Sequence, residues 1–161
     1  MTSGKKTEIG SDAGWLLPHS GRMSLLHQVV AYDDESTTCS VEIRPDSTFV
    51  SNGQVGPWVG LEYMAQAVAA HGGLALRRQG QPVRIGFLLA CRSINFETGP
   101  FRVGQTLHVK ASPLWGNERL LKFSCSIKDA GTGCLLQQAD LSIYDPGEEF
   151  TPETFLEGMG R

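Results

Sequence analysis

The stretch PWVGLEYMAQAVAAHGGLALRR, residues 57–78, decides the fold of this chain. Pro57 suits the first position of a helix, because the N–H group that proline lacks would have no partner inside the helix there. Arg77 and Arg78 lie at the other end, where cationic side chains stabilise the helix dipole. The stretch is apolar nearly all round, which is typical of a buried helix in a globular protein. The sequence therefore predicts one long buried helix over residues 57–78.

The segments on both sides of this stretch alternate polar and apolar residues, as half-buried strands do. Two such runs precede the helix, at 27–33 and 37–43, and four follow it, at 84–97, 104–115, 120–128 and 135–144. Glycines at 131 and 133 suit the turn of a hairpin between the last two runs. This order predicts an α+β fold, with five to seven antiparallel strands in a sheet wrapped around the central helix.

Length and composition indicate a single domain. The chain has 161 residues, of which 40% are hydrophobic, and 14 Lys and Arg against 17 Asp and Glu give a net charge of −3. This balance excludes a nucleic-acid binder driven by bulk charge and a long disordered tail. We expect a flexible arm over residues 1–14, a domain over 15–145 and an acidic, loosely packed tail over 146–161.

The cysteines and histidines show no spacing typical of a metal site, so we predict no metal. The cysteines, which we interpret as reduced, are Cys39, Cys91, Cys125 and Cys134. The N-terminus has no apolar core of a secretory signal, and polar residues interrupt the longest apolar stretch, 58–76. We therefore expect a cytoplasmic protein that binds neither membrane nor nucleic acid.

Glu62 is the only formally charged residue between Pro57 and Leu76. No Lys or Arg lies three or four residues away, and the helix start is more than one turn distant. An unpaired buried carboxylate is costly. Glu62 either faces solvent or a basic residue from a distant strand, or it is an acid/base group that keeps a proton in dry surroundings and donates it.

A base is needed to complement such an acid. Among the histidines, which are His19, His27, His71 and His108, only His19 lies on an irregular loop, where catalytic groups are common. Pro18 and Gly21 restrict the backbone around it. A histidine with no role beyond a surface loop is the alternative interpretation.

Three stretches together resemble the β-hydroxyacyl-acyl-carrier-protein dehydratases. They are LLPHSGRMSLLHQVV (16–30), GLEYMAQAVAAHGGL (60–74) and SINFETGPFRVGQTLHV (93–109), so the resemblance covers about residues 16–144. The strongest resemblance is to the dehydratase-like proteins of aryl polyene biosynthesis. It implies a hotdog fold, in which a curved antiparallel sheet wraps a long helix and protomers pair edge to edge, with active sites at their interface.

The resemblance also implies roles for residues. Glu62 matches the family's catalytic carboxylate, and Gln66 matches a glutamine one turn later that we expect to bind substrate. The family's catalytic histidine lies in a G-H-F-P-G motif ahead of the helix, whereas residues 46–58 read DSTFVSNGQVGPW and contain none. His19 matches a histidine that lines the acyl tunnel, and we predict that it replaces the missing base.

This chain also departs from the family's pattern at the N–H group that binds the thioester oxygen. The family uses the N–H group of a glycine where this chain has Pro57, which has no N–H. The N–H groups of Trp58 and Val59 remain at the helix start, and we expect one of them to hold the thioester oxygen.

These residues predict a 3-hydroxyacyl-acyl-carrier-protein dehydratase that forms trans-2-enoyl thioesters in fatty acid or aryl polyene-type biosynthesis. His19 would take the C2 proton and Glu62 would protonate the leaving hydroxyl, across a gap of about 4–7 Å between the two side chains and without a cofactor. The expected partners are an acyl carrier protein and a second copy or another hotdog subunit. The alternatives are a hotdog acyl thioesterase and a non-catalytic subunit that supports an active dehydratase.

Overall fold

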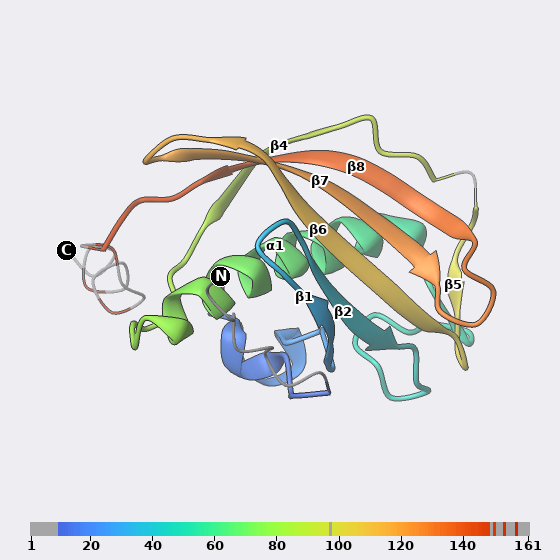
Figure 1. The fold of residues 1–161 in the computed structure, drawn as a ribbon. Coiled ribbons are helices and arrows are strands. Elements are labelled where there is room, and N and C mark those ends of the chain that lie inside the picture. Colours follow the sequence, from blue (N-terminus) through green and yellow to red (C-terminus); the bar gives the residue numbers. More distant parts are fainter. Residues whose placement is uncertain (1–9, 97, 149, 151–152, 154–156, 158–161) are drawn as a thin grey trace.

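The chain folds into a curved antiparallel sheet that wraps one long helix (Figure 1). The computed structural model describes residues 10–96, 98–148, 150, 153 and 157. The strands of the six-stranded sheet run in the order β1-β2-β6-β7-β8-β4. Their bounds are β1 Val29–Tyr32, β2 Thr37–Glu42, β6 Thr106–Gly116, β7 Leu120–Asp129, β8 Leu135–Tyr144 and β4 Phe87–Arg92. A separate short pair joins β3 (Gln54–Val55) to β5 (Phe101–Arg102). The predicted α+β architecture is confirmed.

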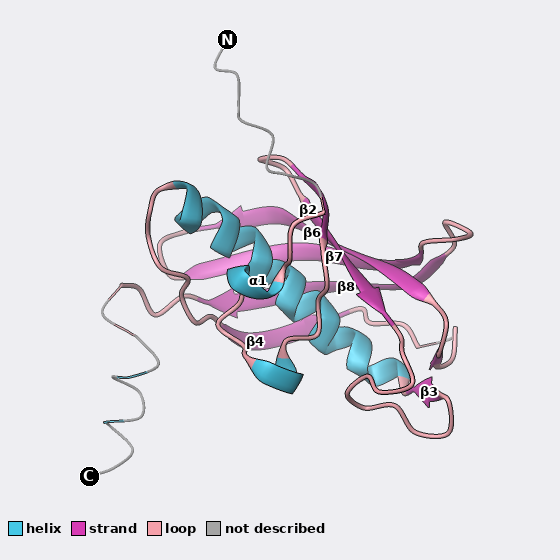
Figure 2. Cartoon of the chain, turned by 90° about the horizontal axis from the view of Figure 1, so that it is seen from below, coloured by secondary structure: helices cyan, strands magenta, loops and turns pink. Residues whose placement is uncertain are grey.

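The helix occupies the predicted stretch, with a tighter first turn. Pro57–Val59 forms a 3₁₀ turn, and the α-helix α1 runs over Gly60–Arg78. Its buried side chains, which include Tyr63, Met64 and Leu74, form the core against β2, β6 and β7. The face of α1 that the sheet leaves open is partly covered by the N-terminal segment, which lies in front of α1 in Figure 2.

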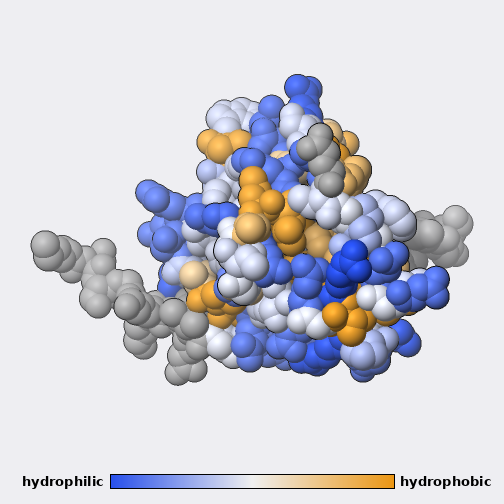
Figure 3. Space-filling view, turned by 90° about the vertical axis from the view of Figure 1, so that its right-hand side faces the viewer, coloured by the Kyte–Doolittle hydropathy of each residue, from blue (hydrophilic) through white to orange (hydrophobic). Residues whose placement is uncertain are grey.

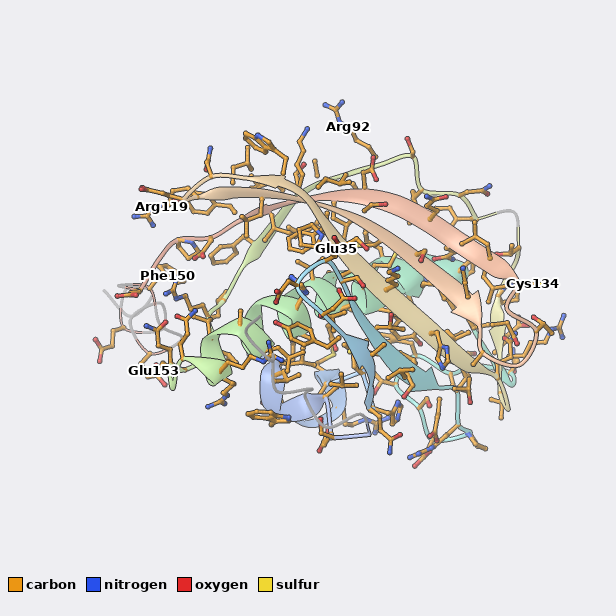
Figure 4. All side chains as sticks on the ribbon, in the orientation of Figure 1. Glu35, Arg92, Arg119, Cys134, Phe150 and Glu153 are labelled. Atoms are coloured by element: carbon orange, nitrogen blue, oxygen red, sulfur yellow. The ribbon has the colours of Figure 1, made fainter. Side chains whose placement is uncertain are left out.

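Alternation in β7 and in most of β8 places the apolar side chains on the helix side of the sheet. In β7, Phe123, Cys125 and Ile127 are buried, whereas Lys122 and Lys128 are exposed. On β4, Arg92 projects away from the helix on the outer side of the sheet (Figure 4). The strand predicted over 84–97 is shorter than expected, because the chain leaves the sheet at Ser93, whose φ of 57° does not suit a strand.

The segment 10–14 differs from the expected flexible arm. The Gly10 N–H donates a hydrogen bond to the Val29 carbonyl at 2.8 Å, Asp12 pairs with Gln28, and Ala13 is fully buried. These contacts cover part of the open edge of β1, which explains why the segment packs here. Residues 1–9 of the predicted arm lie outside the described residues.

The predicted C-terminal tail, 146–161, is described only in part. Phe150, at the end of the molecule where α1 ends (Figure 4), meets Phe87 edge-on with ring centroids 5.5 Å apart. Glu148 pairs with Arg84 at 3.1 Å. Positions 149, 151–152, 154–156 and 158–161 lie outside the described residues, so the expected loose packing of the tail stays a prediction.

No helix in the described part of the chain is long and apolar enough to cross a membrane. The same residues contain no group of three or more acidic, histidine or cysteine side chains placed to hold a metal ion. On the face shown in Figure 3, apolar side chains form small groups separated by polar ones.

Candidate active site

The structure brings His19 and Glu62 together, although 42 residues lie between them in the sequence. His19 Nε2 lies 3.5 Å from Glu62 Oε1. Glu62 lies in the first turn of α1, and His19 lies between two 3₁₀ turns, Gly14–Leu16 and Gly21–Met23. The two side chains are in direct contact, closer than the gap of about 4–7 Å expected for a substrate held between them.

The surroundings of Glu62 differ from the dry environment that the acid/base interpretation of the sequence expected. Its side chain is 39% exposed and lines a groove between α1 and the sheet. Since the α-helix begins at Gly60, Glu62 also lies within the first turn, where the helix dipole stabilises a carboxylate. The exposure of Glu62 agrees with the interpretation as a solvent-facing residue, whereas its partner His19 comes from a loop and not from a distant strand; its acid/base role stays a prediction.

Gln66 does not line the groove, as a substrate-binding residue would be expected to do. Its side chain is fully buried, and its Nε2 donates hydrogen bonds to Glu62 Oε1 at 2.9 Å and to the Met23 carbonyl at 2.7 Å. Its Oε1 accepts a hydrogen bond from the Leu25 N–H at 2.8 Å. Both amide protons are used, so no donor is left for a ligand. Gln66 therefore positions Glu62 and anchors the N-terminal segment.

A glycine in α1 lets the segment that carries His19 approach the helix. A Cβ atom on Gly73 would lie 2.2 Å from the backbone oxygen of Leu16, so only glycine fits at this crossing. Gly21, with a φ of 60°, turns the chain just after His19. The fixed turn that the sequence predicted around His19 thus depends on glycines in both elements.

The two nitrogens of the His19 ring have different environments. Nε2 faces Glu62, whereas Nδ1 is buried without a hydrogen-bond partner in the described part of the chain. No second hydrogen bond therefore fixes which nitrogen carries the proton of the neutral ring. This arrangement allows Nε2 either to accept a proton or to donate one.

Trp58 and Val59 lie apart from the groove that holds His19 and Glu62, and neither lines it. The Val59 N–H donates to the Gly56 carbonyl at 3.1 Å, so the 3₁₀ turn uses the group that was expected to hold an oxyanion. The Trp58 side chain is 69% exposed. The turn occupies the Val59 N–H in this conformation, and the oxyanion roles of Trp58 and Val59 stay predictions.

Sequence reasoning missed Gln137, which fixes the start of the helix. Its Nε2 donates to the Pro57 carbonyl at 2.7 Å, and the residue is only 1% exposed. The signal was present in the alternation of β8, because Gln137 occupies an inward position next to the apolar inward residues Ala139 and Leu141. A polar residue at such a position needs a buried partner.

His27 and His71 are half-buried and have structural partners. His71 Nδ1 is hydrogen-bonded to the Thr37 hydroxyl at 2.7 Å, and burial lowers the pKa of His71. His27 Nδ1 accepts a hydrogen bond from the Glu42 N–H at 3.1 Å, and burial, aided by the Arg44 charge, lowers its pKa. Both shifts favour the neutral form of the ring, and both histidines serve the fold through these hydrogen bonds.

His19 and Glu62 lie at one end of a groove of about 300 Å³. One wall is the stripe of α1 that carries Ala65, Ala69 and Gly72, and the opposite wall comes from β4, β7 and β8. Arg84 and Asp145 also line it. An acid/base pair beside a mostly apolar groove suits proton transfers on a substrate with an apolar tail.

The sequence and the structure are similar to known dehydratases. The model of the ApeP-like family, described as ApeP dehydratase, matches residues 12–157. The dehydratase heterocomplex ApeI:P from Xenorhabdus doucetiae superposes with a TM-score of 0.79 at 27% identity, covering 86% of this chain and 93% of that chain. No curated protein matches the sequence.

More distant structures share the fold. A hypothetical thioesterase from Streptococcus pneumoniae, solved with coenzyme A, gives a TM-score of 0.56 at 15% identity and covers 74% of this chain and 85% of that one. Thioesterase superfamily member 2 from Mus musculus gives 0.55 at 14% identity, with 72% and 79% covered. Together with the topology, these likenesses confirm the predicted hotdog fold.

Proposed function

This chain belongs to the ApeP-like dehydratase family, and we propose that it dehydrates 3-hydroxyacyl thioesters carried on an acyl carrier protein to trans-2-enoyl thioesters. Family membership confirms the resemblance to the dehydratases of aryl polyene biosynthesis that the sequence indicated. The observation that carries the proposal is the contact between His19 Nε2 and Glu62 Oε1, 3.5 Å apart at the end of an apolar groove.

In the proposed reaction, neutral His19 takes the proton from C2 of the substrate through Nε2. The electron pair of the broken C2–H bond forms the C2=C3 double bond, and the C3–O bond breaks. The leaving hydroxyl takes a proton from Glu62 and departs as water. His19 then holds one proton more and Glu62 one fewer. Once the product has left, the two side chains can meet again, and transfer of the proton from His19 to the Glu62 carboxylate restores both.

Gln66 supports this reaction without touching the substrate. Its hydrogen bond to Glu62 Oε1 holds one carboxylate oxygen, so the other oxygen is left to carry the proton. Because the substrate must come between His19 and Glu62, the two side chains must separate from their present contact when it binds. His19 can move more easily, since its Nδ1 has no hydrogen-bond partner among the described residues.

We also propose that the chain works in an oligomer with another hotdog subunit. The related ApeI:P structure is a heterocomplex. In this chain, β4 forms an edge of the sheet, and its Phe87, Leu88 and Leu89 are exposed. An uncovered apolar edge strand is a site for pairing with another chain. A homodimer through the same edge is the alternative, and the expected cytoplasmic location stays a prediction.

One observation favours the second candidate, a non-catalytic subunit of a dehydratase complex. The segment 46–58 contains no histidine, although the resembled family carries its catalytic histidine there. If a partner subunit supplies the base, His19 serves only to orient Glu62. The thioesterases that share the fold do so at identities too low to transfer their activity.

The test is an assay of the purified chain, alone and with its partner subunit, on 3-hydroxyacyl and trans-2-enoyl thioesters of an acyl carrier protein. Reversible hydration of the enoyl substrate is the expected result, and His19→Ala should lower the rate by about 10²–10⁴-fold. The matched control is His108→Ala, since His108 lies on β6 and does not line the groove. Release of free thiol would instead indicate a thioesterase, and full activity of His19→Ala in the complex would indicate that His19 is not the base.

A further inference from the structure

The groove continues well beyond the acid/base pair. From Glu62 it follows α1 past Ala65, Ala69 and Gly72, a distance of about 15 Å at the rise of an α-helix. These small side chains leave room along the helix, and Phe87 and Phe123 are among the larger apolar residues of the other wall. A substrate whose reacting carbons lie at Glu62 would therefore place its tail along this groove.

A charged pair lies at the far end. Arg84 precedes β4 and Asp145 follows β8, and these strands pair at Phe87 and Tyr144, so both residues come to the end where α1 finishes. Arg84 Nη1 lies 3.6 Å from Asp145 Oδ2, with the side chains 27% and 25% exposed. The lining residue Leu76 marks the same end on the helix.

Both members of the pair are held in place by residues outside the groove. Arg84 Nη2 also pairs with Glu148 at 3.1 Å. Asp145 Oδ1 accepts a hydrogen bond from the Gly147 N–H at 2.8 Å. Because each partner has a second anchor, the pair does not swing aside without losing further contacts.

The free energy of binding should depend on tail length in two opposite ways. Each methylene that enters the apolar part of the groove strengthens binding by about fourfold. A methylene that reaches Arg84 and Asp145 displaces the water that solvates the exposed part of this pair, and an ion pair that loses water without gaining a hydrogen bond is destabilised. Affinity should therefore rise with length and then fall.

We infer that the Arg84–Asp145 pair sets the longest apolar acyl tail that this groove accepts. The inference rests on the proposed function for the identity of the ligand as an acyl thioester. Among tails that end before the pair, the affinity increases with each added methylene. Tails that reach the pair bind with lower affinity. The pair is thus a specificity-determining element and not part of the acid/base machinery.

Binding of a series of saturated S-acyl pantetheine thioesters to the full chain, measured by calorimetry, tests this inference. The wild-type protein should show affinity that rises by about fourfold per methylene to a limit and then falls. In the double variant Arg84→Met with Asp145→Leu, which replaces the pair with apolar side chains, the fall should disappear or move to longer tails. Calorimetry needs no turnover, so this result is separable from a failure of the proposed dehydration.

Two further variants keep the test decisive. Glu148→Gln removes a charge that does not line the groove but keeps a side-chain oxygen that can accept the hydrogen bond from Arg84 Nη2, so it should leave the length limit unchanged. Arg84→Met alone leaves the Asp145 carboxylate without the guanidinium, and an unpaired carboxylate costs more to desolvate than a paired one. Its affinity should therefore fall more steeply with tail length than that of the wild type, and an unchanged length dependence in this variant would overturn the inference if the double variant does not fold. An unchanged limit in a folded double variant, or a moved limit in Glu148→Gln, would overturn the inference.

Discussion

Nε2 of Gln66 lies 2.9 Å from Oε1 of Glu62 and holds that carboxylate from inside the protein, one helical turn away. The same buried amide accepts a hydrogen bond from the Leu25 N–H and donates one to the Met23 carbonyl. One side chain thus fixes both the Glu62 carboxylate and the segment that carries His19. The geometry of the His19–Glu62 contact depends on this residue, which touches no substrate.

Gln66→Met should therefore change stability and activity together. Loss of the amide leaves the buried Leu25 N–H without its partner, so the free energy of unfolding should fall by about 1–3 kcal/mol. Enoyl hydration should fall mainly in kcat, because Glu62 is no longer oriented. Urea unfolding and steady-state kinetics measure the two effects. Gln138→Met, on the exposed side of β8, is the control and should change stability by less than about 0.5 kcal/mol.

Glu62→Gln should abolish turnover while the fold is retained. A glutamine still offers a carbonyl oxygen to Gln66 Nε2, but it cannot give up a proton, so the rate should fall by about 10²–10⁴-fold. Because Glu62 is 39% exposed and hydrogen-bonded, removal of its charge should shift the free energy of unfolding by less than about 1 kcal/mol. Strong destabilisation with a nearly unchanged rate would show that the carboxylate is structural.

The helix and the strands could be predicted because local patterns determine them. The apolar stretch 57–78 and the alternation in 120–128 each need only their own residues to be interpreted. β3 and β5 were missed, since strands of two residues carry no periodic signal.

The candidate site was predictable only in part. The resemblance pointed to His19 and Glu62, and the structure places them in contact. The exposure of Glu62 could not be predicted, because it depends on where the segment 16–23 crosses α1. That crossing is determined by contacts distant in sequence, those of Gln66 with Met23 and Leu25 and the close approach at Gly73.

Stability should fall as the pH drops below the ordinary pKa of histidine, about 6.5, and His71 should account for part of this fall. Burial, opposed by the charges of Asp33 and Asp34, lowers the pKa of His71 in the folded protein. Between the two pKa values the unfolded state binds more protons, so acid favours unfolding. His71→Gln, which cannot titrate, should lose less stability than the wild type between about pH 7.5 and about pH 5. Urea unfolding at both pH values measures the difference, and equal losses in the two proteins would contradict the assignment.

Two adjacent glycines of α1 should respond oppositely to alanine. A Cβ on Gly72 meets nothing within 4 Å, so Gly72→Ala should raise the free energy of unfolding by about 0.5–1 kcal/mol through helix propensity. A Cβ on Gly73 would lie 2.2 Å from the Leu16 oxygen, a backbone atom that moves only with its segment. Gly73→Ala should therefore lower stability by about 1–3 kcal/mol despite the same gain in propensity.

The Gly73→Ala substitution should also change the position of His19, because Leu16 lies three residues before it. If the segment moves away from α1, the His19–Glu62 contact opens, and enoyl hydration should fall more in Gly73→Ala than its loss of stability explains. Rates measured well below the unfolding temperature separate the two effects. A Gly73→Ala protein as stable and active as the wild type would show that the segment is not held against the helix at this crossing, and the position assigned to His19 would fail with it.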